Sequence, residues 1–180
     1  AVALDRSECD DILGSYLGAE RRLLLLDYDG TLVPFSNDPK SAVPGEALLK
    51  TLKLLSEDPK NEVVLISGRD RAVLDEWFKG LDIGLVAEHG AWIKRGKGDW
   101  SMLKSLSSDW KPMVLPIIKR YADRLPGALV EEKEYSLVWH YRAADPEAAQ
   151  AKARELVDDL LSFTSNIPVQ VLQGNKIVEV

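Results

Sequence analysis

Cysteine is almost absent from this chain, whose 180 residues include only Cys9. A single cysteine excludes a disulfide framework within the chain and a zinc site built from several cysteines. The sequence also lacks a secretory leader and any apolar run approaching the length of a membrane span. We therefore expect a cytoplasmic protein that does not have a membrane as a partner.

Blocks of basic residues are absent as well, and the formal net charge is −6. Nucleic acid is therefore not expected as a partner, because binding to phosphate backbones requires clustered positive charge. An acidic protein that acts on an anionic substrate needs a metal ion or a few well-placed cations instead. A hydrophobic share of 46% argues for a packed core rather than disorder.

Three short apolar runs predict strands at Arg22–Leu26, Asn61–Ile66 and Ile83–Ala87. The first run holds four consecutive leucines, which is typical of a strand covered on both faces. The intervening periodicity predicts helices at Gly45–Ser56 and Asp70–Phe78, and the first twenty residues also favour a helix. Strands that alternate with helices predict an α/β unit with a parallel sheet.

The pattern changes after residue 103, so we expect one domain at 1–103 and another at 104–180. The pattern of the second domain predicts the order α-β-β-α-β-β. It also predicts an antiparallel sheet, because the paired strands are joined by short turns. Its last turn is expected at Gln173-Gly174-Asn175. The expected elements are Ser108–Leu125, Ala128–Lys133, Ser136–Arg142, Pro146–Phe163, Pro168–Leu172 and Lys176–Val180.

Two acids, Asp27 and Asp29, follow the leucine strand directly and precede Gly30-Thr31. This arrangement suits phosphoryl transfer, because one carboxylate can attack phosphorus while the other moves the proton. Gly30 allows a sharp turn whose N–H groups can face a phosphate. Two acids this close repel each other, and Mg²⁺, which prefers oxygen ligands, would relieve that repulsion. The alternative is a plain Asp-Gly turn.

The other two predicted strands end in Ser67-Gly68-Arg69 and Glu88-His89-Gly90. Because the carboxyl ends of parallel strands share one edge, all three polar segments are expected to lie together there, where ligands bind in α/β sheets. The alternatives are an ordinary strand-to-helix turn at Ser67-Gly68 and a surface ion pair for Arg69. His89 could likewise be an edge histidine with no role in binding.

The segment Asp27-Tyr28-Asp29-Gly30-Thr31-Leu32 resembles the first motif of the haloacid dehalogenase-like phosphohydrolases, and Ser67 resembles their second. Further segments resemble the trehalose-6-phosphate phosphatases within that superfamily. The resemblance implies a Rossmann-like core, of which this chain contains the first three strands, and an inserted α+β cap. The segments that carry it are Leu65–Arg69, Ala87–Ala91, Glu131–Arg142 and Gly174–Val180.

For the core, the resemblance implies that Asp27 is the nucleophile and a Mg²⁺ ligand. It implies that Asp29 is the general acid and base, with its backbone carbonyl on the metal. The phosphate is expected to bind at Gly30, Ser67 and Gly68. The floor of the sugar-phosphate pocket is expected to include Arg69, Glu88, His89 and Gly90.

For the cap, the resemblance implies sugar-binding roles for Glu131, Lys133, Arg142 and Glu179. Paired acids and bases suit this task, because sugar hydroxyls both donate and accept hydrogen bonds. The alternative for Glu131 and Lys133 is the solvated face of a hairpin.

The family continues, beyond the point matched by Val180, with a lysine and an acidic cluster that complete the Mg²⁺ site. We therefore expect the rest of the core to lie C-terminal to residue 180. The leading interpretation is a Mg²⁺-dependent phosphatase that hydrolyses trehalose 6-phosphate. A trehalose-6-phosphate synthase domain or subunit is a candidate partner. The alternatives are a phosphatase for sucrose phosphate or another sugar phosphate, and a non-catalytic regulatory module of a synthase assembly.

Overall fold

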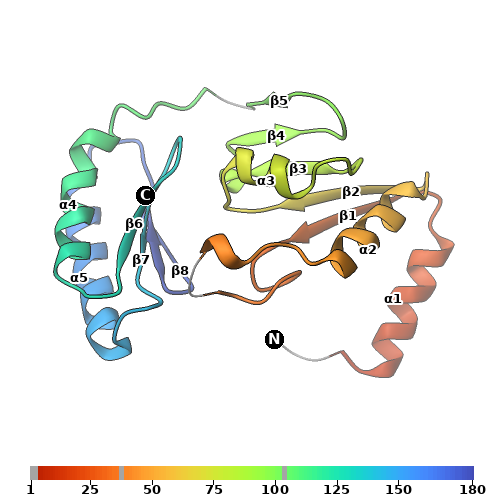
Figure 1. Cartoon of the computed structure of the whole chain (residues 1–180), viewed down its shortest axis with the longest axis horizontal. Helices are drawn as coiled ribbons and strands as arrows, with labels where there is room; N and C mark the ends of the chain where they lie inside the picture. Colours follow the sequence, from red (N-terminus) through yellow and green to blue (C-terminus); the bar gives the residue numbers. More distant parts are fainter. Residues whose placement is uncertain (1–3, 37–38, 103–104) are drawn as a thin grey trace. The chain divides into compact units, whose positions relative to one another are not determined.

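The computed structural model describes residues 4–36, 39–102 and 105–180, which divide into two compact units (Figure 1). The first unit contains the described residues of 4–35 and 40–101, and the second contains residues 36, 39, 102 and 105–180. The boundary expected between residues 103 and 104 lies outside the described residues.

The first unit is built on three parallel strands, β1 (Arg22–Asp27), β2 (Asn61–Ile66) and β3 (Gly84–Ala87). Helices α2 (Glu46–Glu57) and α3 (Arg71–Trp77) connect them, as the alternating pattern predicts. Both helices pack on the same face of the sheet, where the buried side chains form one core. That core includes Leu52, Val63, Leu65, Leu74, Phe78, Leu85 and Ala87.

Two further strands, β4 (Trp92–Lys94) and β5 (Trp100–Ser101), extend this sheet in antiparallel fashion. The sheet is therefore mixed, in the order β1-β2-β3-β4-β5, and the expectation of three strands in this unit was wrong. These strands contain only three and two residues, too few for a periodic pattern. Contacts between side chains hold them, since Lys94 Nζ and Trp100 Nε1 each donate to Asp75 of α3 at 2.6 Å.

The leucine strand β1 lies at the edge of the sheet in the part of the chain that the structure describes. Leu24 and Leu26 pack against the core, whereas Leu23 and Leu25 are each 58% exposed. The expectation that the run is covered on both faces was therefore wrong for this structure. Strand residues alternate between the two faces, and α2 and α3 cover only one of them.

The first helix, α1 (Arg6–Gly18), precedes β1 and has no buried residue. Its N-terminus is fixed by a capping box, in which Asp5 and Glu8 accept each other's backbone N–H. Tyr16 joins the helix to the sheet through Asn61, whose side-chain nitrogen donates to the Tyr16 hydroxyl at 2.9 Å. The helix expected in the first twenty residues is thus present.

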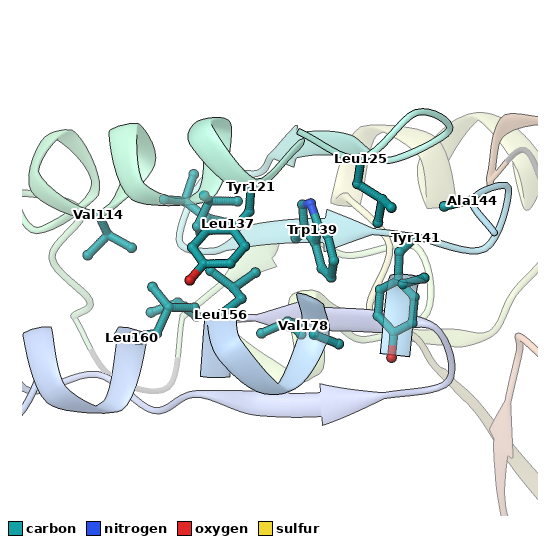
Figure 2. Close-up of a cluster of buried hydrophobic side chains, with 14 of the residues drawn as sticks. Val114, Tyr121, Leu125, Leu137, Trp139, Tyr141, Ala144, Leu156, Leu160 and Val178 are labelled. Atoms are coloured by element: carbon teal, nitrogen blue, oxygen red, sulfur yellow. The ribbon is translucent and has the colours of Figure 1, made fainter. Parts of the chain in front are cut away.

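The second unit follows the predicted order, with α4 (Lys111–Asp123), β6 (Leu129–Glu132), β7 (Leu137–His140), α5 (Pro146–Phe163), β8 (Leu172–Gly174) and β9 (Ile177–Glu179). Its strands form an antiparallel sheet in the order β6-β7-β9-β8. Trp139 and Val178 of this sheet pack against Tyr121 of α4 and Leu156 of α5 (Figure 2).

The first strand of the last hairpin ends two residues later than expected. That strand is Leu172–Gly174 rather than Pro168–Leu172, and the turn falls at Asn175-Lys176, where Lys176 has a positive φ of 64°. The reason is that Val169 and Val171 pack against the core instead of joining the ladder. None of the helices in residues 4–36, 39–102 and 105–180 has the length and apolar character to cross a bilayer.

Candidate active site

The loop that follows β1 is a tight turn closed by its own backbone. The N–H groups of Leu32 and Val33 donate to the Tyr28 carbonyl at 3.0 and 3.1 Å, and Gly30 N–H donates to Val33 O at 2.8 Å. Gly30 has a φ of 86°, and a Cβ there would lie 2.4 Å from the ring of Phe35. Glycine is therefore required at Gly30 for both backbone conformation and space.

Asp27, the last residue of β1, is exposed at the carboxyl edge of the sheet. One of its carboxylate oxygens, Oδ2, accepts a hydrogen bond of 2.8 Å from the hydroxyl of Thr31, four residues later. The turn therefore orients the carboxylate while keeping it accessible.

Asp29 points its carboxylate at the guanidinium of Arg69. Arg69 Nε donates to Oδ2 at 3.0 Å and Nη2 donates to Oδ1 at 2.7 Å, so the contact is bidentate. The Arg69 side chain is only 13% exposed, and its guanidinium carbon lies 4.6 Å from the Trp77 ring centre and 5.4 Å from that of Tyr28. Arg69 therefore pairs with an acid of the site.

Tyr28 separates the two acids and is fully buried. Its hydroxyl donates to the Ala42 carbonyl at 2.7 Å, and its ring packs edge-on against Phe78. Burial raises the pKa of Tyr28 to about 12; Asp29 acts in the same direction, and Arg69 opposes it. The residue thus remains a neutral anchor that fixes the turn to the core.

Ser67 follows β2 and is almost fully buried. Its N–H donates to Val86 O at 2.9 Å, and its hydroxyl oxygen accepts from the Arg69 N–H at 3.1 Å. Since that bond uses an acceptor site, the hydroxyl proton is left for donation to a ligand.

The turn after β3 lies directly against Ser67-Gly68-Arg69. Glu88 N–H donates to Arg69 O at 3.1 Å, and His89 N–H donates to Ser67 O at 3.2 Å. Glu88, His89 and Gly90 all have positive φ, of 46°, 54° and 104°. This conformation costs about 1–2 kcal/mol for each non-glycine residue, which these hydrogen bonds help to offset. The structure therefore brings the three predicted strand ends together at one edge.

The second unit groups three of the four predicted sugar-binding residues on the sheet face opposite its helices. Lys133 Nζ lies 3.4 Å from Glu179 Oε1, and both side chains are less than 10% exposed. Glu131 is opposite Val138 in the ladder and lies 2.7 Å from His140 Nε2. These contacts form a polar cluster within an otherwise well-packed domain.

Arg142 lies away from this cluster, beyond the other end of β7. Its Nη2 donates to the Asn175 carbonyl at 2.6 Å, beside the last turn. The four residues of β7 separate it from Lys133, a span on the order of 10 Å. The structure therefore does not place Arg142 together with the Lys133–Glu179 pair.

Three supporting residues were missed by sequence reasoning as members of these sites. Tyr28 and Trp77 hold the Arg69 side chain, and Ser136 Oγ donates to Glu179 at 2.8 Å. The position of Trp77 on the same helix as buried Leu74 was a usable signal for packing. No pattern in the sequence, however, indicates that its ring lies beneath a guanidinium.

Asp27 and Asp29 supply the oxygen donors that Mg²⁺ prefers. Within the described ranges, no group of three or more His, Cys, Asp or Glu side chains is arranged to hold a metal ion. The carboxylate of Asp27 and the backbone carbonyl of Asp29 therefore fit part of a Mg²⁺ site, since the Asp29 carboxylate is bound to Arg69.

The model of the trehalose-phosphatase family matches residues 25–180. The bifunctional trehalose-6-phosphate synthase/phosphatase of Thermoproteus tenax is 40% identical over 177 residues, which cover 98% of this chain and 24% of that protein. The solved C-terminal domain of the C. albicans trehalose-6-phosphate phosphatase superposes with a TM-score of 0.93 at 38% identity. That match covers 98% of this chain and 61% of the other.

A haloacid dehalogenase-like hydrolase from Bacteroides thetaiotaomicron has a TM-score of 0.59 at 14% identity, over 88% of this chain and 70% of that one. This likeness extends to the fold, so the chain has a mixed-sheet α/β fold similar to that of haloacid dehalogenase-like hydrolases. The chain spans between 19% and 24% of the length of curated relatives that it matches.

Proposed function

Because the chain belongs to the trehalose-phosphatase family, we propose that it hydrolyses trehalose 6-phosphate to trehalose and phosphate through an aspartyl-phosphate intermediate. One observation carries this proposal: Asp27, Asp29 and the buried Ser67 follow neighbouring strands at one edge of the sheet. The choice of substrate is supported by two of the relatives named above, a bifunctional trehalose-6-phosphate synthase/phosphatase and a trehalose-6-phosphate phosphatase. The reaction type is supported by the groups at this edge of the sheet.

In the first step, an oxygen of Asp27 bonds to phosphorus and the bond from phosphorus to the sugar oxygen breaks. Asp29, protonated, gives its proton to that leaving oxygen. The hydroxyl of Thr31 holds one oxygen of Asp27, which leaves the other for attack. Ser67 and the Gly30 turn bind the phosphoryl oxygens.

In the second step, water attacks phosphorus and gives its proton to the Asp29 carboxylate. The bond between phosphorus and Asp27 breaks, which releases phosphate and restores the nucleophile. Both acids therefore finish the cycle in the state in which they began it, and no further reactant is needed.

We propose Mg²⁺ as the cofactor, held by the carboxylate of Asp27 and the backbone carbonyl of Asp29. When bound, the ion offsets the negative charge of the phosphate beside two acids. The fit rests on the oxygen donors of this turn and on the accessible carboxylate of Asp27.

The second unit is proposed to act as a cap that binds the sugar. Lys133 and Glu179 offer a donor and an acceptor within one buried pair, and Glu131 adds another acceptor. Such a mixed set suits hydroxyl groups in a site that excludes water. Arg142 is proposed to contact the sugar more peripherally, since it lies beyond the far end of β7.

An association with a trehalose-6-phosphate synthase domain or subunit is also proposed. Its support is that the T. tenax relative is a bifunctional synthase/phosphatase. We further propose the division into a core and a cap near residue 103, with additional core elements C-terminal to residue 180.

Replacing Asp27 with asparagine in the intact protein tests the activity. We expect phosphate release from trehalose 6-phosphate to fall to background, because an amide cannot form the acyl phosphate. The matched control is Asp109→Asn, an exposed acid in the second unit, which should retain full activity. Substantial turnover by Asp27→Asn would refute this residue as the nucleophile.

A panel of sugar phosphates identifies the substrate. Trehalose 6-phosphate should give the highest kcat/KM, and a preference for sucrose phosphate would instead support the related phosphatase. Calorimetric binding of the sugar phosphate without any phosphate release would support a regulatory module.

A further inference from the structure

Arg69 contacts several groups of the site at once. Its guanidinium donates hydrogen bonds to both carboxylate oxygens of Asp29, at 2.7 and 3.0 Å. Its backbone N–H donates to the Ser67 hydroxyl oxygen, and its carbonyl accepts from Glu88 N–H. One residue thus touches the acid and base, the phosphate-binding hydroxyl and the turn after β3.

We infer that Arg69 is a positioning residue, which holds the carboxylate of Asp29 in the orientation for proton transfer and is not a ligand for the sugar. This inference rests on the proposed function. Asp29 lies in the tight turn after β1, where a lone aspartate could adopt several rotamers. A bidentate guanidinium fixes both the position and the plane of the carboxylate.

The bidentate contact with Arg69 leaves Asp29 able to donate and accept a proton. An ionised carboxylate has about four acceptor sites, and the two bonds from Arg69 occupy two of them. Each oxygen therefore keeps a site, which can carry the proton that is given to the leaving oxygen or accept the proton of the attacking water. A lysine at this position would offer a point charge without the planar fork, so it would hold the carboxylate less firmly.

Arg69 is itself held rigidly, which a positioning role requires. Its guanidinium lies over the rings of Trp77 and Tyr28, which are 5.6 Å apart. Tyr28 is anchored in turn through its hydroxyl to the Ala42 carbonyl. A charged group that is only 13% exposed and stacked in this way is poorly placed to follow a mobile sugar.

The test uses the intact protein and a series of aryl phosphates whose phenol leaving groups differ in acidity. These substrates carry no sugar, and kcat/KM reports the steps up to departure of the phenol. A well-placed acid makes kcat/KM nearly independent of the leaving group, because it protonates the departing oxygen. If Asp29 loses its placement, kcat/KM should fall selectively for the aryl phosphates with poor leaving groups.

For Arg69→Met we expect kcat/KM to fall by about 10²-fold with the least acidic phenol and with trehalose 6-phosphate. With the most acidic phenol the fall should be only a few-fold, and the KM for trehalose 6-phosphate should stay nearly unchanged. Arg69→Lys should give an intermediate slope. Thermal unfolding of each variant reports whether it is folded, and the leaving-group slope is independent of the active fraction.

Arg71→Lys and Arg71→Met provide the matched controls, because Arg71 also stacks on an indole, that of Trp92 at 3.8 Å. Both should keep the wild-type slope. An equal loss across the aryl series, or a raised KM with unchanged kcat for trehalose 6-phosphate, would overturn the positioning role. An inactive wild type would instead overturn the proposed function, and this inference with it.

Discussion

Replacement of Gly68 by alanine tests how tightly the turn after β3 is fitted against the phosphate-binding segment. A Cβ at Gly68 would lie 2.4 Å from His89 Nε2 and 2.6 Å from Cε1, distances that real Cβ atoms do not show. The backbone of Gly68 is not in the left-handed region, so alanine can adopt its conformation. The whole effect should therefore be steric.

The magnitude follows from how the imidazole gives way. The backbone of His89 is held with a φ of 54° and by its N–H bond to Ser67 O at 3.2 Å, but its side chain is exposed. The ring can therefore relieve the overlap by rotating toward solvent. Holding a side chain away from its preferred rotamer costs about 0.5–1.5 kcal/mol. We expect a loss of that size in unfolding free energy, with a fall in activity.

The assay is urea unfolding followed by tryptophan fluorescence, arranged as a double-mutant cycle with His89→Ala. Removing the imidazole opens the space, so Gly68→Ala should cost little in the His89→Ala background. The coupling energy should then account for most of the loss of about 0.5–1.5 kcal/mol. Gly14→Ala is the control, because nothing lies within 4 Å of its Cβ position. A Gly68→Ala penalty of equal size in both backgrounds would refute the reasoning.

Two further perturbations address stability. Lys133→Met should lower the unfolding free energy by about 3–5 kcal/mol, because it removes the cation that is paired with the buried Glu179 carboxylate, and Lys133→Met/Glu179→Met should recover much of it. Urea unfolding without any loss in Lys133→Met would contradict this. Burial opposes the ionisation of Asp75, but hydrogen bonds from Lys94 and Trp100 outweigh it and hold the pKa of Asp75 below its ordinary value. The stabilisation is present above the unfolded pKa of about 4 and is lost as pH falls through the lower folded pKa. Asp75→Asn should therefore be less stable than wild type at pH 7, by no more than about 1 kcal/mol because the carboxylate is 41% exposed, and the gap in melting temperature should close in acid.

The sequence predicted those elements that bury a continuous or periodic apolar face. The strands around Leu65 and Leu85 and the helix around Leu156 were placed correctly, because burial imposes a pattern on the residues themselves. Strands β4 and β5 were missed because they are too short for a periodic pattern and are held by partners distant in the sequence, namely β3 in the ladder and Asp75 on a helix well before them. The leucine run was misjudged because the residues of a strand cannot show which of its faces another element covers.

The strand ends were predicted as a shared site, and the structure brings them together. The supporting contacts were not predicted, since they depend on side chains that meet only in the folded chain. The cation–π contact of Arg69 with Trp77 and the bond from Ser136 to Glu179 are examples. Residue type identified the groups that can do chemistry, whereas tertiary geometry decides which of them hold the others in place.

The contact between Arg69 and Asp29 is one that strand register alone could have supplied. Asp27 stands opposite Ile66 in the parallel ladder between β1 and β2. Asp29 and Arg69 then lie two and three residues beyond the same rung, on strands about 4.8 Å apart. An arginine side chain easily spans that separation, and Asp29 lies just past the end of the neighbouring strand. The two motifs therefore predict a partnership, because parallel strands that end in step bring their following residues within reach of each other.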